Sequence, residues 1–153
     1  MKRSSVIFTS YEDKRMKQAY VDSSVWITMA EGIAQYQEIV RHALQQLEAD
    51  GWQLCLSDLV VLEVKLKPYR QERYDLIAEY DLLFFETAIF SPFDSVFHDA
   101  LEYAKTNGLK TMDAIHIAFA VNYKCELFVT TDQDFHTLKS LPLHMIDLSQ
   151  AIP

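Results

Sequence analysis

Short apolar segments alternate with longer helical stretches along most of this chain, and few folds can accommodate that alternation. The segments rich in β-branched or aromatic residues, which are typical of strands, are residues 19–22, 52–56, 88–91, 126–131 and 143–148. The stretches between them predict helices that end near Gly32 and Gly51, and helices over about 57–67, 71–85, 95–106 and 111–123. This order is typical of βα units arranged around a parallel sheet.

The chain has the size of a single domain. Its 153 residues are 50% hydrophobic, which is enough for one buried core, so we expect one domain over 16–153. Residues 1–15 lack periodicity, and we expect them to be a flexible leader. No apolar run approaches the roughly 20 residues of a membrane helix and no signal peptide is evident, so we expect a cytoplasmic protein without membrane contact. Cys55 and Cys125 are predicted to be buried thiols rather than a disulfide or a zinc site.

The net charge is −8 and is unevenly distributed. Residues 1–15 contain four basic and two acidic side chains, a charge of +2, so residues 16–153 carry −10. An acidic body argues against a protein that coats nucleic acid non-specifically, because such binding depends on Lys and Arg neutralising phosphates. It does not exclude a nuclease, since cations bound to clustered carboxylates reverse the local charge and attract phosphate.

Four acidic residues are predicted to approach one edge of the sheet. Asp22 closes the first strand and Asp132 closes the fourth, and ligands of open parallel sheets bind at the carboxyl ends of strands. Asp113 lies in the first turn of a helix that should begin at the same edge, and Glu63 lies in the helix that follows the second strand. The sequence therefore predicts an acidic site built from residues distant in the chain.

Each acid also has a purely structural interpretation. Asp22 is suited to cap the following helix, and Asp113 is favourable beside a helix dipole. Glu63 is predicted to border a core stripe, so it needs a partner, and Lys67 four residues later offers a surface salt bridge. The residues expected to form that stripe are Leu59, Leu62 and Leu66.

Four converging carboxylates would repel one another unless cations lie between them. Oxygen ligands without cysteine favour Mg²⁺ or Mn²⁺. Such a site activates water and stabilises a leaving oxygen, so it hydrolyses phosphodiesters without a Ser, Cys or His nucleophile.

Four segments together resemble the signature blocks of PIN domains: residues 20–24, 57–64, 111–118 (TMDAIHIA) and 128–135 (FVTTDQDF). The resemblance covers about residues 16–148, although a leader as long as 1–15 is unusual for the family. It implies a three-layer αβα sandwich with a central, mainly parallel five-stranded sheet and RNA cleavage that depends on Mg²⁺ or Mn²⁺. Many small members are VapC-type toxins restrained by an antitoxin, so we expect an antitoxin partner, and we also expect a homodimer.

The resemblance assigns roles to individual positions. Asp22, Glu63, Asp113 and Asp132 match the family's acidic quartet, which implies catalytic and metal-binding roles. The remaining positions are Asp134 as a further outer ligand, Ser23 and Thr131 as supporting residues, and His116 as a residue that packs or hydrogen-bonds in the core rather than acting as a base.

A basic patch follows Glu63 and consists of Lys65, Lys67, Arg70 and Arg73. One interpretation is that Lys65, Lys67 and Arg70 contact RNA phosphates beside the metals. The alternative is a solvated face whose basic residues pair with nearby acids, namely Glu72, Asp75 or Glu79.

The sequence is compatible with three functions. The leading hypothesis is a metal-dependent endoribonuclease acting as the toxin of a toxin–antitoxin pair. The second is a catalytically silent binding module of the same fold, against which the intact acidic quartet argues. The third is a receiver-like phosphoacceptor domain, which needs an acidic pair after its first strand and a late lysine; here serines follow Asp22 and the first lysine after Asp132 is Lys139.

Overall fold

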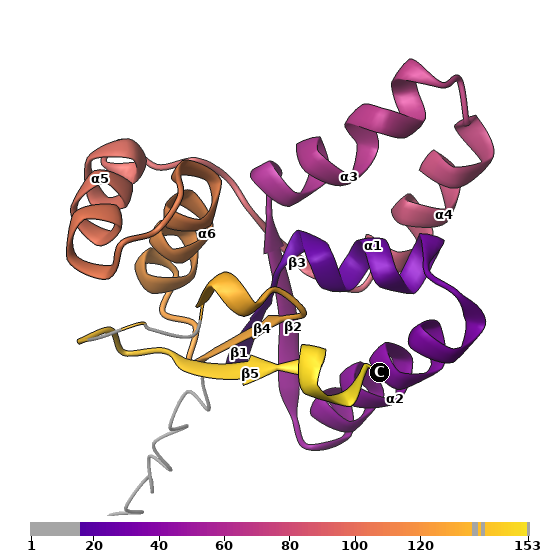
Figure 1. Ribbon diagram of the computed structural model, residues 1–153, viewed down its shortest axis with the longest axis horizontal. Helices are drawn as coiled ribbons and strands as arrows, with labels where there is room; N and C mark the ends of the chain where they lie inside the picture. The colour runs from indigo at the N-terminus through magenta and orange to yellow at the C-terminus, as the bar shows by residue number, and fades with distance from the viewer. Residues whose placement is uncertain (1–15, 136–137, 139, 153) are drawn as a thin grey trace, which may run out of the picture.

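A computed structural model of the protein describes residues 16–135, 138 and 140–152, and these residues form a five-stranded parallel sheet (Figure 1). The strand order is β3-β2-β1-β4-β5 and every neighbouring pair is parallel. The strands are β1 (Lys17–Val21), β2 (Trp52–Ser57), β3 (Ala88–Phe90), β4 (Leu127–Thr130) and β5 (His144–Asp147). All five predicted strands are present, each within two residues of its expected ends. The expected leader, 1–15, lies outside the described residues.

Helices cover both faces of the sheet (Figure 1). α5 and α6 pack against each other on one side, and α1 to α4 lie on the other. The helices are α1 (Ser23–Glu31), α2 (Ala34–Ala49), α3 (Asp58–Arg70), α4 (Tyr74–Phe84), α5 (Val96–Asn107) and α6 (Thr111–Asn122), with short 3₁₀ helices at Gln133–Phe135 and Leu148–Ala151. The predicted three-layer α/β fold is confirmed.

The central strands are apolar because helices cover them on both sides. Ala19, Tyr20 and Val21 of β1 are completely buried, and every residue of β4 is at most 8% exposed. The chain leaves β1 toward β2 and β3 on one side and later returns to β4 and β5 on the other. The boundary between β1 and β4 is therefore the point where the strand order reverses, which is where open α/β sheets bind ligands.

The predicted core stripe of α3 is wrong. The helix buries Val60, Val64 and Pro68, whereas Leu62 and Leu66 are 58% and 43% exposed. Leu59 is only partly buried against the core. The segment is apolar nearly all round, so its periodicity does not single out one face, and the shorter Val side chains fit against the sheet. Pro68 lies inside the helix, which ends two residues later at Arg70.

The predictions for the two cysteines and for Gly108 are confirmed. Cys55 and Cys125 are buried free thiols, and their mutual contact, together with burial, raises the pKa of Cys125. Gly108 ends α5 with a φ of 64°, a conformation that favours glycine. Within the described part of the chain, no helix is both long and apolar enough to cross a membrane.

Candidate metal centre

Asp22 and Asp132 lie where β1 and β4 end, at the reversal point of the strand order. Asp22 directly follows β1 and donates its backbone N–H to the carbonyl of Val129 in β4 over 2.9 Å. It also caps α1, since its Oδ1 accepts the N–H of Ser23 at 2.7 Å. The capping interpretation of Asp22 is thus correct, but it leaves the carboxylate buried at the edge where the ligand site was predicted.

Three carboxylates form a compact cluster at this edge. One oxygen from each of Asp113, Asp132 and Asp134 lies within 4.8 Å of the other two. Asp113 comes from the first turn of α6, and Asp134 lies in the 3₁₀ helix that follows β4. The backbone N–H of Asp134 donates to Asp132 Oδ1 at 2.9 Å. Asp134 is therefore part of the cluster itself, where the sequence had placed it as an outer ligand.

Glu63 lies beside Asp22 and is connected to it through two other side chains. Ser23 Oγ donates to Glu63 Oε1 at 3.2 Å. His116 Nε2 bonds the same oxygen and lies 3.7 Å from Asp22 Oδ1. The partner of Glu63 among the described residues is thus a histidine of α6, and the alternative pairing with Lys67 does not form.

Two hydroxyl groups join Asp22 to the segment that carries Asp132. Thr130 Oγ1 donates to Asp22 Oδ2 at 2.9 Å and accepts the N–H of Asp132 at 2.9 Å. Ser24 Oγ donates to the same Asp22 oxygen at 2.9 Å and accepts the N–H of Thr131 at 3.1 Å. The expected support from Thr131 thus comes through its backbone, whereas the hydroxyl that contacts the acids belongs to Thr130. The sequence contains both threonines in succession and does not distinguish them.

The charges of the acids act on one another across the site. The pKa of Asp113 is raised from 3.8 to about 6, mainly by burial and then by the charges of Asp132 and Asp22. Asp22 and the three-carboxylate cluster therefore belong to one electrostatic unit. Closely spaced carboxylate oxygens without a cysteine are the donor set expected for a hard divalent cation, so the residues present fit Mg²⁺ or Mn²⁺.

Lys110 is a residue of the site that sequence reasoning missed. Its Nζ lies 2.9 Å from Asp134 Oδ2, and the hydrogen bond and charge of Asp134 raise the lysine pKa. Only the three-dimensional fold brings residues 110 and 134 together. Their proximity places one exposed positive charge beside the acidic cluster.

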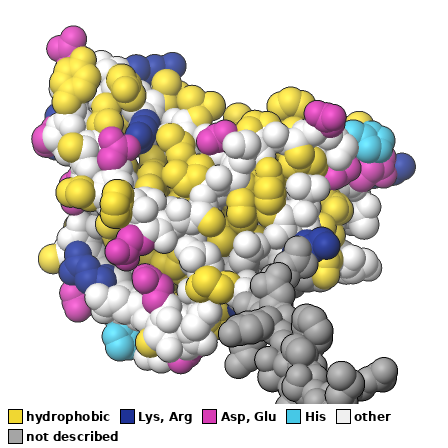
Figure 2. Space-filling model, turned by 180° about the vertical axis from the view of Figure 1, so that it is seen from behind, with side chains coloured by type: hydrophobic (Ala, Val, Ile, Leu, Met, Phe, Trp, Pro, Cys, Tyr) yellow, Lys and Arg dark blue, Asp and Glu magenta, His cyan; other side chains and the backbone are white. Residues whose placement is uncertain are grey.

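The basic patch on α3 is partly neutralised. Lys65 pairs with Asp81 of α4, and Arg73 pairs with Asp75. Lys67 and Arg70 are exposed at the end of the helix. On the face shown in Figure 2, Lys and Arg side chains appear as separate patches and form no continuous basic stripe.

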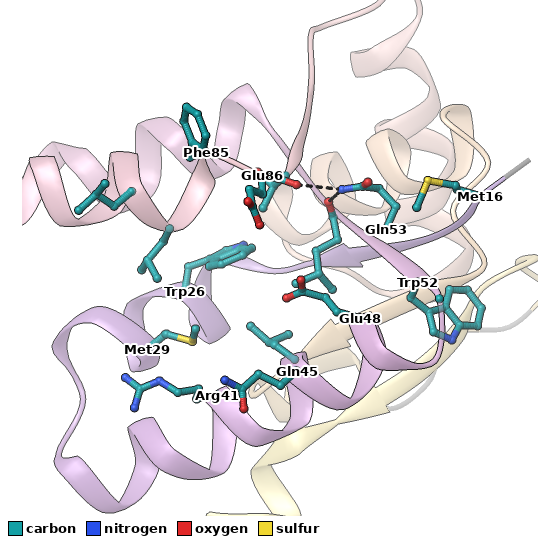
Figure 3. A pocket seen from close by; sticks show the side chains of 16 residues that line it. Met16, Trp26, Met29, Arg41, Gln45, Glu48, Trp52, Gln53, Phe85 and Glu86 are labelled. Carbon is teal, nitrogen blue, oxygen red and sulfur yellow. Dashed lines mark hydrogen bonds between the residues drawn. The ribbon is translucent and has the colours of Figure 1, made fainter.

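A groove of about 640 Å³ lies away from the acids, between α1, α2, β2 and the end of α4 (Figure 3). Its lining is mainly apolar and includes Trp26, Met29 and Phe85, with Arg41, Glu48 and Glu86 at its borders (Figure 3). None of the clustered carboxylates lines it. The groove is thus a separate feature from the candidate metal centre.

His116 is buried, as predicted, and hydrogen-bonds in the core. Its Nδ1 lies 2.7 Å from the Tyr20 hydroxyl, which in turn lies 2.7 Å from Ser57 Oγ. Burial is the main cause of the raised pKa of Tyr20, and the charges of Asp22 and Glu63 add to it.

Comparison with solved structures shows the fold of toxin–antitoxin proteins. VapBC2 from Rickettsia felis, bound to a promoter DNA fragment, has a TM-score of 0.69 at 13% identity, covering 85% of this chain and 99% of that one. VapBC-1 from nontypeable Haemophilus influenzae has a TM-score of 0.68 at 15% identity, and the match covers 86% of this chain and 98% of that one. VapC20 from Mycobacterium tuberculosis, a toxin that cleaves the sarcin–ricin loop, has a TM-score of 0.61 at 14% identity. The match covers 77% of this chain and 92% of that one.

Comparison with curated proteins finds no match. The family model of the PIN domain matches residues 19–141, most of the chain and all of the acidic residues described above. The resemblance noted in the sequence is confirmed: the chain belongs to the PIN-domain family.

Proposed function

We propose that this protein is a metal-dependent endoribonuclease that hydrolyses RNA phosphodiester bonds, and that it acts in the cytoplasm as the toxin of a toxin–antitoxin pair. The observation that carries the proposal is the cluster of Asp113, Asp132 and Asp134. Asp22 and Glu63 meet at His116, and the charge of Asp22 acts on Asp113, whose pKa is raised to about 6. Burial and the charges of Asp132 and Asp22 disfavour the ionised form of Asp113, and a bound cation would offset this cost.

The residues proposed to hold Mg²⁺ or Mn²⁺ are Asp22, Glu63, Asp113 and Asp132, with Asp134 as a further ligand. A divalent cation bound there supplies positive charge for the phosphodiester and makes water a better nucleophile at neutral pH. In the reaction, the water oxygen forms a bond to phosphorus, the bond to the leaving ribose oxygen breaks, and that oxygen takes a proton.

The other side chains at the site orient the acids or bind substrate. Ser24 and Thr130 both donate to Asp22, which fixes the direction of its carboxylate. Ser23 donates to Glu63 in the same way. For RNA binding, we propose contacts from Lys110 beside the acids and from the basic patch of Lys65, Lys67 and Arg70, in which Lys65 would first have to leave Asp81.

The proposed partner is an antitoxin protein, and the proposed assembly is a homodimer. Support comes from similar structures that are VapBC or toxin–antitoxin complexes. The groove of Figure 3 is bordered by the exposed side chains of Leu82 and Phe85, which are apolar groups of the kind that partners cover. Co-expression with the product of a neighbouring small reading frame, followed by co-purification, tests this partner.

Cleavage by the purified protein tests the activity. The wild type should cut RNA in the presence of Mg²⁺ or Mn²⁺, and excess chelator should stop it. Asp22→Asn should abolish cleavage and relieve growth inhibition on induction, because asparagine keeps the cap of α1 but removes the charge. Asp50→Asn is the matched control, since Asp50 caps the C-terminus of α2 shortly before β2 begins, at the opposite edge of the sheet. Equal cleavage by wild type and Asp22→Asn, or undiminished cleavage in chelator, would contradict the proposal.

The same assay separates the alternatives. A silent binding module would bind RNA or the antitoxin but give no cleavage that depends on both metal and Asp22. The receiver-like interpretation is set aside, because the family shown by the chain is the PIN domain.

A further inference from the structure

A chain of buried hydrogen bonds runs from the core of the sheet to the candidate metal centre. Ser57 Oγ lies 2.7 Å from the Tyr20 hydroxyl, the hydroxyl lies 2.7 Å from His116 Nδ1, and His116 Nε2 bonds Glu63 Oε1. Ser57, Tyr20 and His116 are at most 1% exposed. These three side chains come from β2, β1 and α6, so the contact forms only in the folded protein.

Only one direction of these bonds satisfies every buried polar atom while the imidazole is neutral. An ionised Glu63 only accepts hydrogen bonds, so His116 must carry its proton on Nε2. The unprotonated Nδ1 then accepts the hydrogen of the Tyr20 hydroxyl, and the Tyr20 oxygen accepts that of Ser57. The proton on Nε2 is thereby determined by the tyrosine on the other side of the ring.

Rings that pack on each other hold Tyr20 and His116 in place. The Tyr20 ring stacks on Phe128 of β4 at 5.3 Å with an interplanar angle of 12°. His116 meets the edge of Tyr20 at 5.8 Å and 62°. Neither ring can turn freely in so densely packed a core, so the position of Nε2 is fixed more firmly than the flexible Glu63 side chain that it contacts.

Glu63 depends on this histidine for its orientation. Its only other described hydrogen bond comes from Ser23 Oγ at 3.2 Å to the same oxygen, Oε1. Both donors therefore bond Oε1, which leaves Oε2 available to bind a cation. His116 Nε2 also lies 3.7 Å from Asp22 Oδ1, between the two carboxylates.

We propose that His116, kept in its Nε2-protonated form by Tyr20 and Ser57, is a positioning residue that fixes Glu63 beside Asp22 and so sets the affinity of the centre for divalent cations. This inference rests on the proposed function, because it assigns a role within the same site. Residues that orient metal-binding carboxylates typically change metal affinity by about 10–100-fold when they are replaced.

Tyr20→Phe is the variant that tests the relay. It removes the hydroxyl group and leaves the ring stacked on Phe128, so the fold should persist. The matched control is Tyr80→Phe, which removes another buried hydroxyl, one that donates to Glu31 in α1. Both variants lose a buried tyrosine hydroxyl. Tyr80→Phe loses one hydrogen bond and Tyr20→Phe loses two, and only Tyr20→Phe releases His116.

The first measurement is the Mn²⁺ affinity of the full chain by calorimetry. Tyr20→Phe should bind Mn²⁺ at least about 10-fold more weakly than wild type, and Tyr80→Phe should bind as wild type does. Cleavage by Tyr20→Phe should require more Mn²⁺ for half-maximal rate yet approach the wild-type rate at saturation. Equal Mn²⁺ affinity in wild type and Tyr20→Phe would overturn the inference.

The second measurement does not involve metal or activity. Nitrogen NMR of the metal-free wild type, recorded over a pH series, should show that the neutral form of His116 carries its proton on Nε2, and Tyr20→Phe should change the signal of Nδ1. A neutral ring protonated on Nδ1 in the wild type would overturn the inference. If the wild type neither binds Mn²⁺ nor cleaves RNA, the proposed function fails, whereas normal binding and cleavage in Tyr20→Phe refute the relay alone.

Discussion

Asp113→Asn should make the metal-free protein more stable, although it removes a proposed metal ligand. Burial and the charges of Asp132 and Asp22 together raise the pKa of Asp113 from 3.8 to about 6. Such a shift corresponds to about 3 kcal/mol of unfavourable free energy for the ionised carboxyl in the folded state. Asp113 is partly exposed, so solvent screening reduces this value, and we expect a gain of about 1–2 kcal/mol in the free energy of unfolding at pH 7.5.

The same pKa shift fixes the pH dependence of this gain. The folded protein holds the Asp113 proton more strongly than the unfolded chain does. The stability supplied by protonation is therefore fully present below about pH 4 and is lost as the pH rises through about 6. The advantage of Asp113→Asn over wild type should thus be about half as large at pH 5 as at pH 7.5.

Urea unfolding in excess chelator at pH 5 and pH 7.5 measures both effects. Asp50→Asn serves as the control and should match the wild type at each pH. Adding Mn²⁺ in place of chelator should stabilise the wild type more than Asp113→Asn, because only the native site binds the cation tightly. The reasoning is refuted if Asp113→Asn is no more stable than wild type in chelator at pH 7.5, or if its advantage is the same at both pH values.

Two further pairs of variants test individual contacts. Thr130→Val should lower both the cleavage rate and the Mn²⁺ affinity about 10-fold, because it removes the hydroxyl bonded to Asp22 and to the Asp132 backbone. Thr131→Val, the control, should change both quantities less. Equal effects in the two variants would mean that the Thr130 hydroxyl has no special role. In chemical denaturation, Val64→Ala should lower the free energy of unfolding by about 2 kcal/mol and Leu62→Gln by less than about 0.5 kcal/mol, because Val64 is buried and Leu62 is exposed. The opposite order would support the core stripe of Leu59, Leu62 and Leu66 that the sequence predicted.

The strands and the edge of the sheet that carries the acids could be predicted from the sequence. Buried parallel strands are short, apolar and β-branched, so their positions show in the residue types alone. Asp22 directly follows β1 and Asp132 lies two residues beyond β4, and the topology then brings them to the same edge. No knowledge of side-chain packing is needed for either inference.

The detailed contacts of the site could not be predicted. His116 rather than Lys67 bonds Glu63, because the fold brings the side chain of a residue far along the chain to Glu63, and no local spacing reports that contact. The hydroxyl that bonds Asp22 is that of Thr130 rather than Thr131, because successive strand residues face opposite sides and the sequence does not fix the register within one residue.

The face of α3 was mispredicted for a different reason. Apolar residues occur nearly all round this helix, so local pattern gives several equivalent stripes. Only packing against the sheet selects Val60 and Val64 and leaves Leu62 exposed. The pairing of Lys65 with Asp81 likewise depends on how α4 folds back beside α3.

The central claim is that acids distant in the sequence hold a divalent cation together, and crystals of the full chain grown with Mn²⁺ test it most directly. Anomalous scattering identifies manganese independently of any assumption about ligands. The account predicts an anomalous peak within coordination distance of Asp113 and Asp132, at the edge where β1 and β4 end. Crystals that contain Mn²⁺ but show no peak at this edge, or a peak elsewhere only, would contradict it.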